Sequence, residues 1–266
     1  LRLGRVLWCA VGASGVETAA DFFSFTGGAS VLLAHGLAMA AGRVSQAKMW
    51  AWEITGVYAQ FAAWNLHDLG TDVRLVKPPM LHWRGPEAQR LLSTVMRRGA
   101  RNATVRAVVV NAPPVDYGAF RSPPSEELLL AQCHGDGAGV EFVFIDSTLP
   151  FVPEFVMLAQ ACRHLRWVAV TNVNVEANAG WVARYLANVT GWHLLASGSH
   201  EWPDVVIRSG NAVGPPIPTR REWQLLARSD AFRGRRPPDV EAWLADVRMR
   251  PGVAARLVAN RARAAA

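Results

Sequence analysis

The chain alternates between short apolar runs, each long enough for one strand, and longer amphipathic stretches with the periodicity of a helix. The apolar runs cover residues 5–11, 48–53, 73–77, 105–110, 140–145, 166–170, 192–196 and 203–208. The amphipathic stretches cover residues 28–41, 56–69, 86–98, 125–133, 153–163 and 177–187. Alternating strands and helices are joined by crossovers, so the pattern predicts a mostly parallel sheet with helices on both faces.

The last two apolar runs are too close in the sequence to be joined by a helical crossover. The turn-rich segment SGSHEWPD, residues 197–204, lies between them and predicts an antiparallel hairpin at the sheet edge. The expected fold is a doubly wound, mostly parallel Rossmann-like α/β domain over residues 1–212, followed by a basic helical extension over residues 213–266. Whether 73–77 or 105–110 is the third strand of the sheet stays open.

Composition is compatible with one such domain and argues against several other classes. The chain has 266 residues, 51% of them hydrophobic, which is enough to bury a large core. The net charge of +7 comes from scattered arginines that become denser toward the end, so we expect a solvated basic surface and no specific nucleic acid. The cysteines have no metal-binding spacing and are expected to be reduced, buried thiols; they are Cys9, Cys133 and Cys162.

The same features bear on location. No apolar run is long enough to cross a bilayer, so a soluble protein is expected. A cytoplasmic location is favoured. A lumenal one is expected if a leader precedes this chain, because two arginines before an apolar stretch at the start of the sequence are typical of secretory leaders.

The residues that follow the predicted strands are the first candidates for a site, because ligands of doubly wound sheets bind outside the carboxyl ends of the strands. They are the segment 17–30, Glu53, Asn111, Asp146 and the pair Thr171 and Asn172. Asp146 comes directly after the apolar run 140–145, which indicates that its side chain enters the ligand crevice.

Glu53 follows a strand and comes one helix after a turn that contains Gly27 and Gly28. This arrangement lets a carboxylate accept hydrogen bonds from both hydroxyls of a ribose; the alternative is a charge placed at a helix N-terminus. The glycines precede a helix with Ser30 in its first turn, so backbone amides can face a ligand, unless the turn is merely tight. A G-x-G-x-x-G motif is missing, which argues against a nicotinamide or flavin dinucleotide.

Four stretches together resemble the class I S-adenosylmethionine-dependent methyltransferases, and among these the O-methyltransferase-like branch that includes the catechol-type enzymes. The stretches are GVETAADFFSFTGGAS, MWAWEITGVYAQFAAWNL, VEFVFIDSTLPFVPEFVMLAQACRHLRWVAVTNVN and AGWVARYLANVTGWHLL. The resemblance covers roughly residues 14–210. It implies S-adenosylmethionine as the cofactor and methyl transfer, to a hydroxyl of a small molecule, as the reaction.

The resemblance also assigns roles to individual residues. Glu17 takes the place of the acid that ends the first strand, although its distance from the glycines requires an insertion. Glu53 takes the place of the ribose-binding acid, and Asn111 borders the adenine if 105–110 is the third strand. The implied cofactor-binding residues are Glu17, Gly27, Gly28, Ser30, Glu53, Asn111 and Asp146.

Metal-dependent members of this family bind magnesium through the residue at Asp146 and a later Asp-Asn pair, which reads Thr171 and Asn172 here. Because one carboxylate is missing, a magnesium site is not favoured. Without metal, Asp146 could hold the methionine part of the cofactor or orient a substrate hydroxyl, and Asn172 could donate to it, so these two are the candidate catalytic residues. The alternatives are a cap at Asp146 and a turn residue at Asn172.

Two further observations limit the function. The sequence has no nucleophile elbow and no zinc-protease motif, and its seven histidines lack ligand spacing. The loop 111–125 carries Tyr117 and Phe120, so it is either a lid over a flat acceptor or a surface loop. The competing function is a catalytically degenerate relative that binds or scaffolds, which the irregular glycine turn and Thr171 favour.

Overall fold

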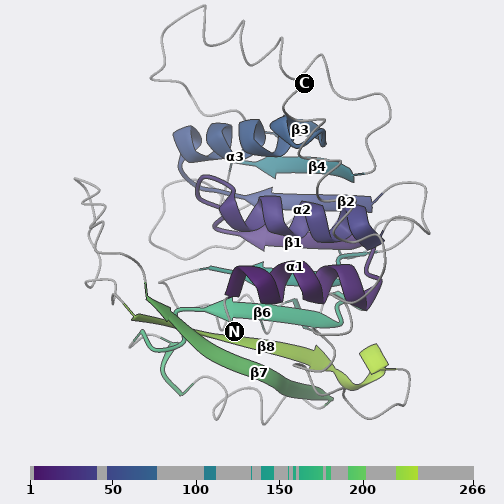
Figure 1. Cartoon of the computed structure of the whole chain (residues 1–266), viewed down its shortest axis with the longest axis vertical. Helices are drawn as coiled ribbons and strands as arrows, with labels where there is room; N and C mark the ends of the chain where they lie inside the picture. The colour runs from purple at the N-terminus through teal and green to yellow at the C-terminus, as the bar shows by residue number, and fades with distance from the viewer. Residues whose placement is uncertain are drawn as a thin grey trace, which may run out of the picture.

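The computed structural model describes eleven parts of the chain (Figure 1), namely residues 3–40, 47–76, 105–111, 133, 139–146, 155, 158–159, 162–175, 178–180, 191–201 and 220–232. The helices are α1 (Leu3–Ser14), α2 (Gly28–Ala40) and α3 (Gly56–Asp68), with a short 3-10 helix η4 (Ser229–Phe232). The strands are β1 (Thr18–Phe22), β2 (Ala47–Trp52), β3 (Asp72–Val76), β4 (Val105–Val110), β5 (Phe142–Ile145), β6 (Trp167–Thr171), β7 (Trp192–Glu201) and β8 (Arg220–Arg228).

These strands form a single sheet in the order β3-β4-β2-β1-β5-β6-β8-β7. All pairs from β3 to β6 are parallel. Strand β8 is antiparallel to β6, and β7 is antiparallel to β8. The predicted fold class, a doubly wound and mostly parallel sheet with an antiparallel pair at its end, is confirmed.

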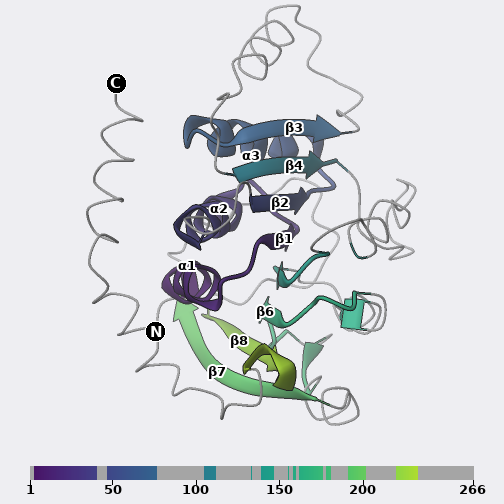
Figure 2. The ribbon, with the colours of Figure 1, turned by 90° about the vertical axis from the view of Figure 1, so that its right-hand side faces the viewer.

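Both faces of the sheet are covered, because alternate residues of its strands enter two different cores. In β5, Phe142 and Phe144 join the core that lies beneath α1, α2 and α3. Val143 and Ile145 join a second core, to which Phe155 and Leu158 contribute from the other face. Figure 2 shows α1 and α2 side by side on one face of the sheet. No helix in the described residues is long and apolar enough to cross a membrane.

Counted outward from β1, the third strand of the sheet is β4. The sequence had left this position open between 73–77 and 105–110. Strand β4 pairs with β2 along its whole length, and β3 lies outside it at the sheet edge. The predicted helices at 86–98 and most of those at 125–133, 153–163 and 177–187 lie outside the described residues.

Two predicted elements are wrong. The apolar run 5–11 belongs to helix α1, because a short apolar run has the same pattern in a strand and in a buried helix. The partner of β7 is β8, at 220–228, which lies inside the range expected to be a helical extension, so the sheet continues past residue 212. The expected turn at 197–204 is strand as far as Glu201, and the run 203–208 lies outside the described residues.

The expectation of three reduced thiols is also wrong. Cys133 and Cys162 form a disulfide with their Cα atoms 4.5 Å apart, and Cys9 is free and buried. The two bonded residues are 29 positions apart in the sequence but belong to the same core, on the face opposite α1 and α2. Their sequence spacing carried no sign of this contact, because the two residues meet only in the core that they share.

Helices α1 and α2 approach closely at two glycines. A Cβ atom on Gly36 would lie 2.9 Å from the Trp8 carbonyl oxygen and 2.9 Å from the Val11 Cβ, whereas one on Gly12 would meet the Gly36 carbonyl oxygen at an ordinary 3.6 Å. Only Gly36 is therefore required by the packing of the two backbones.

Gly36→Ala is expected to destabilise the protein by about 1–3 kcal/mol, because the added methyl overlaps the backbone of α1. Gly12→Ala is the matched control: both sites are helical, so both gain up to about 1 kcal/mol of helix propensity, and only Gly36 loses packing. Denaturant unfolding of the two variants and the wild type measures the difference. Equal stability of the two variants would contradict the close approach.

Candidate functional site

The strand order reverses between β1 and β5: from β1 the chain proceeds to β2 and β4 on one side, while β5 and β6 lie on the other. At such a switch point the carboxyl ends of the strands leave a crevice in which ligands bind. Glu53, Asn111, Asp146 and Asn172 each follow the last residue of β2, β4, β5 or β6. The structure thus brings these four predicted residues to one edge of the sheet.

Asp21, in β1 at the same edge, is the most buried acid of the site. It is fully inaccessible to solvent, and its Oδ2 accepts a hydrogen bond of 2.5 Å from the Ser30 hydroxyl of α2. Burial raises the pKa of Asp21 to about 7, and the nearby charges of Asp146 and Glu53 raise it as well. Ser30, which the sequence predicted to bind the cofactor, donates to this acid.

Glu53 holds two turns together with its two carboxylate oxygens. Its Oε2 accepts from the Phe25 amide at 2.7 Å, in the loop after β1, and its Oε1 accepts from the Thr55 amide at 2.7 Å, in the turn before α3. Burial raises the pKa of Glu53, although these backbone donors act in the opposite direction. Each carboxylate oxygen has a second acceptor site, so the two turns do not exhaust its capacity to bind ligand hydroxyls.

Asn111 fixes the turn that carries Glu53. Its side-chain amide donates to the Glu53 carbonyl oxygen at 2.9 Å and to the Ile54 carbonyl oxygen at 3.2 Å. The Glu53 amide in turn donates to the Val110 carbonyl oxygen at 3.0 Å. Because β4 is the strand next to β2, the condition under which Asn111 was predicted to border an adenine is met.

The loop between β1 and α2 has an unusual backbone. Phe23, Phe25 and Gly27 have φ angles of 63°, 49° and 86°, in the left-handed region that glycine adopts freely. A bulky residue there is an outlier that costs roughly 1–2 kcal/mol, and such strain is concentrated at ligand sites. Phe23, Phe25 and Gly28 have the spacing of the first, second and third glycines of the dinucleotide-binding loop.

The backbone of this loop therefore has the left-handed conformations typical of a glycine-rich loop, but two of its positions carry phenylalanine side chains. The Phe25 side chain contacts Tyr58 of α3, with ring centroids 4.1 Å apart, and Phe25 is 37% exposed. In a glycine loop the second position lets the backbone approach the ligand, and here a ring stands at that position. Gly27 is needed for a different reason: a Cβ there would lie 2.8 Å from Ala62 Cα of α3.

Asp146, Thr171 and Asn172 form a polar cluster beyond β5 and β6. Asp146 Oδ1 accepts a hydrogen bond of 2.5 Å from the Thr171 hydroxyl and one of 2.9 Å from the Asn172 side-chain amide. Asn172 is buried and left-handed, with a φ of 57°. The structure thus brings these three residues into one hydrogen-bonded group.

Strand β8 brings Arg221 to this cluster, a residue that no sequence pattern predicted to belong to the site. Its Nη1 lies 3.8 Å from Asp146 Oδ1, and its side chain is only 16% exposed. A guanidinium at this distance opposes a second cation beside Asp146. No group of three His, Cys, Asp or Glu side chains that could hold a metal occurs in the residues that the structure describes.

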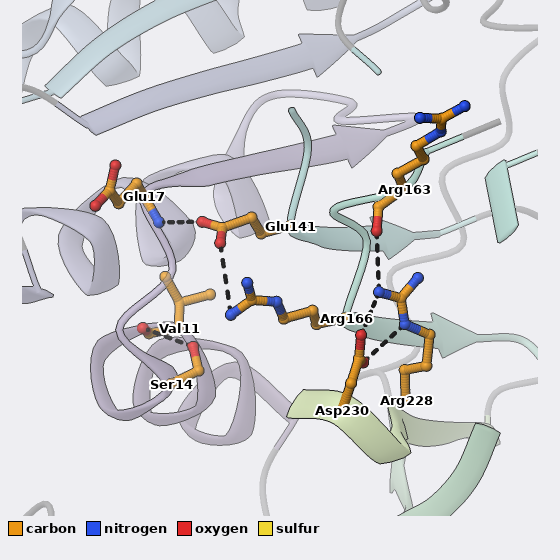
Figure 3. A network of polar contacts seen from close by, with 8 residues as sticks. All are labelled: Val11, Ser14, Glu17, Glu141, Arg163, Arg166, Arg228 and Asp230. Carbon is orange, nitrogen blue, oxygen red and sulfur yellow. Dashed lines mark hydrogen bonds and ion pairs between the residues drawn. The ribbon is translucent and has the colours of Figure 1, made fainter. Parts of the chain in front are cut away.

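Glu17 is at the opposite end of the sheet, so its predicted place beside the cofactor is wrong. It precedes β1, and its backbone amide donates to Glu141 Oε2 at 2.6 Å, while Arg166 Nη1 lies 4.0 Å from Glu141 Oε1 (Figure 3). The acid near the carboxyl end of β1 is Asp21, four residues later. The loop that contains Gly27 and Gly28 begins two residues after Asp21, where β1 ends, so Asp21 needs a shorter separation from the glycines than Glu17 did.

Several buried polar atoms at this edge have no hydrogen-bond partner. Among the described residues they include Asp21 Oδ1 and Ser24 Oγ, at the end of β1 and in the loop after it, and Asn172 Oδ1, beyond β6. Buried polar atoms are normally paired, so an accumulation of unpaired ones where strands end at a switch point fits a ligand-binding edge.

Comparisons with known proteins give the following result. No family model and no curated protein matches the sequence. The O-methyltransferase TomG from Streptomyces achromogenes, involved in tomaymycin synthesis and solved in complex with SAM, matches 85% of this chain and 79% of its own, with 15% identity and a TM-score of 0.49. An O-methyltransferase from Bacillus cereus in complex with SAH matches 85% and 80%, with 12% identity and a TM-score of 0.47.

The raised pKa of Asp21 predicts a pH dependence of stability. The unfolded chain releases this proton near pH 3.8 and the folded chain at about pH 7, so the stability from protonated Asp21 is complete below the first value and lost as the pH rises through the second. The melting temperature of Asp21→Asn minus that of the wild type should therefore increase as the pH rises from 3.8 to about 7. Above pH 7 this difference should stay constant.

Thermal unfolding of both proteins across this range of pH measures the difference. Asp68→Asn is the control, because the Asp68 side chain is 71% exposed. A difference between Asp21→Asn and the wild type that did not change with pH would contradict the buried, protonated carboxyl.

Proposed function

We propose that the chain binds S-adenosylmethionine at this edge of the sheet and transfers its methyl group to a hydroxyl of a small molecule. The observation that carries the proposal is Glu53: a buried carboxylate directly after the strand next to β1, anchored to the turns on both sides. This is the place from which an acid binds the ribose hydroxyls of a nucleoside ligand.

The charges of the site suit the rest of that ligand. S-adenosylmethionine supplies an electrophilic methyl on a positively charged sulfonium. The Asp146 charge is near enough to raise the pKa of Asp21, and Asp21 ionises at about pH 7, so it adds negative charge at the switch point above that pH and favours a cation there. Asn111, fixed against the Glu53 turn, would border the adenine. The protein's contribution to methyl transfer is mainly to position the two reactants.

Glu53→Ala is expected to weaken binding of S-adenosylhomocysteine about tenfold or more, because charge-assisted hydrogen bonds to the ribose are lost. The same variant also frees the Phe25 and Thr55 amides, so a matched ligand is needed. Binding of an analogue in which hydrogen replaces both ribose hydroxyls should be weakened less by the substitution, because only the effect on the loop remains. Calorimetric titration measures all four affinities, and equal weakening for both ligands would contradict the ribose contact.

A second candidate function is a binding module of the same fold that has lost the cofactor. Phe23 and Phe25 favour it, because their rings stand where glycines would let a ligand approach the backbone. The two candidates predict different wild-type behaviour: a methyltransferase binds the cofactor, and a degenerate module does not.

Phe25→Gly is expected to bind S-adenosylhomocysteine about tenfold more tightly than the wild type, because the ring is removed and glycine accepts the left-handed backbone without strain. Phe61→Ala is the control, since Phe61 of α3 is as exposed, at 39% against 37% for Phe25. Binding by Phe25→Gly alone would establish the second candidate. Unchanged or weaker binding would show that the ring does not limit the site.

A further inference from the structure

The two oxygens of the Asp146 carboxylate have different surroundings. Within the described residues, Oδ1 receives the Thr171 hydroxyl, the Asn172 amide and the Arg221 guanidinium. No contact described for Asp146 involves Oδ2, and the side chain is 30% exposed. The first oxygen therefore fixes the carboxylate in place, while the second can accept a hydrogen bond from a ligand.

Arg221 is held next to this carboxylate without a direct hydrogen bond to it. The 3.8 Å between Nη1 and Oδ1 is an ion-pair distance, longer than the 2.7–3.2 Å typical of N–H···O hydrogen bonds. A polar separation of this size is often bridged by a third oxygen, such as that of a water or a ligand. The side chain is largely buried, so its charge acts at short range with little screening.

We propose that Asp146 and Arg221 form a binding site for a hydroxyl that ionises, in which Asp146 Oδ2 accepts the proton and Arg221 stabilises the resulting oxyanion. The inference rests on the proposed function, because this oxyanion is the nucleophile that methyl transfer to oxygen requires.

The physical basis is an exchange of partners within the site. Before proton transfer, Asp146 is the negative partner of Arg221, and the ligand hydroxyl is neutral. After it, Asp146 is neutral and the oxyanion is the negative partner, so the net charge of the site does not change. The guanidinium of Arg221 thus provides the positive charge beside the oxyanion that a divalent cation would otherwise provide.

This chemistry selects a class of acceptor. A phenol, like the tyrosine side chain, ionises near pH ~10, whereas an aliphatic hydroxyl resembles water and ionises only at a far higher pH. An opposite charge close by favours an ionised group by roughly 10-fold to 1,000-fold, which is useful for a phenol and far too little for an alcohol. The acceptor class is therefore a phenol or an enol.

The transfer step balances within this scheme. The acceptor O–H bond breaks, its proton goes to Asp146 Oδ2, and the electron pair stays on the oxygen. That oxygen forms a bond to the methyl carbon of S-adenosylmethionine as the carbon–sulfur bond breaks, and the bonding pair remains on sulfur. The partly exposed Asp146 then releases its proton to solvent.

The test uses para-nitrophenol, whose anion is coloured, with the full-length protein and no cofactor. Above the pH at which the free probe ionises, the wild type should bind the anion together with one proton, so its affinity should fall about tenfold per pH unit. Arg221→Gln should lose about tenfold or more in affinity at every pH. Asp146→Asn should bind the anion more tightly than the wild type at high pH, with no pH dependence, because the anion no longer meets the negative charge of Asp146 and no proton is needed.

Arg220→Gln is the matched control. Arg220 is exposed, and successive residues of a strand point to opposite faces. Its contact with Asn174 uses its backbone carbonyl oxygen, which the substitution keeps. This variant should bind the anion as the wild type does. Thermal unfolding of each variant identifies any that does not fold.

Wild-type affinity that does not change with pH, or equal binding by Arg221→Gln and the wild type, would overturn the proposal. If Arg221→Gln does not fold, the opposite effect of Asp146→Asn decides, since a carboxylate with a purely structural role would give weaker binding when changed. The assay contains no cofactor, so failure to bind S-adenosylmethionine would refute the proposed function and leave this result unaffected.

Discussion

The Glu53 carboxylate is the contact on which the candidate site depends. Through its two oxygens it joins the loop after β1 to the turn before α3, and Asn111 ties the same turn to β4. Strands β1, β2 and β4, which are neighbours in the sheet, are thus also connected at their carboxyl ends. Burying a carboxylate is costly unless its oxygens are hydrogen-bonded, and the amides of Phe25 and Thr55 meet that requirement.

The same contact explains how the strained loop persists. Left-handed backbone at Phe23 and Phe25 is unfavourable, and a residue stays in such a conformation only where its surroundings fix it. The Phe25 amide is bound to Glu53 and its ring to Tyr58, so both its main chain and its side chain are held. A change at Glu53 therefore acts on the loop as well as on any ligand, which is why ligand pairs are needed to separate the two effects.

The sequence predicted the parts of the site that follow from strand order. Parallel strands end at one edge, so an apolar run followed by Glu53, Asn111 or Asp146 was enough to place these residues together. Asp21 was missed because the first strand was placed at 5–11, which belongs to α1, so Glu17 was taken as the acid that follows it; a short apolar run has the same pattern in a strand and in a buried helix. Arg221 was missed because its strand pairs with β6 across more than forty intervening residues, and only that pairing brings it to Asp146. The disulfide was missed as well, because only the folded core brings Cys133 and Cys162, 29 positions apart in the sequence, into contact.

The missed residues decide the electrostatics of the edge. Three carboxylates at one switch point, those of Asp21, Glu53 and Asp146, would repel one another if all were ionised. Two features reduce this repulsion: Asp21 is buried deeply enough to keep its proton up to about pH 7, and Asp146 is compensated by Arg221. The two sides of the switch point therefore differ in charge. An acid that ionises at about pH 7, Asp21, lies under the loop after β1, and the ion pair of Asp146 and Arg221 lies beyond β5 and β6. One side of the switch point is therefore suited to a cationic group and the other to an oxygen that becomes negative, which are the two charges that meet when a sulfonium methyl is transferred to a hydroxyl.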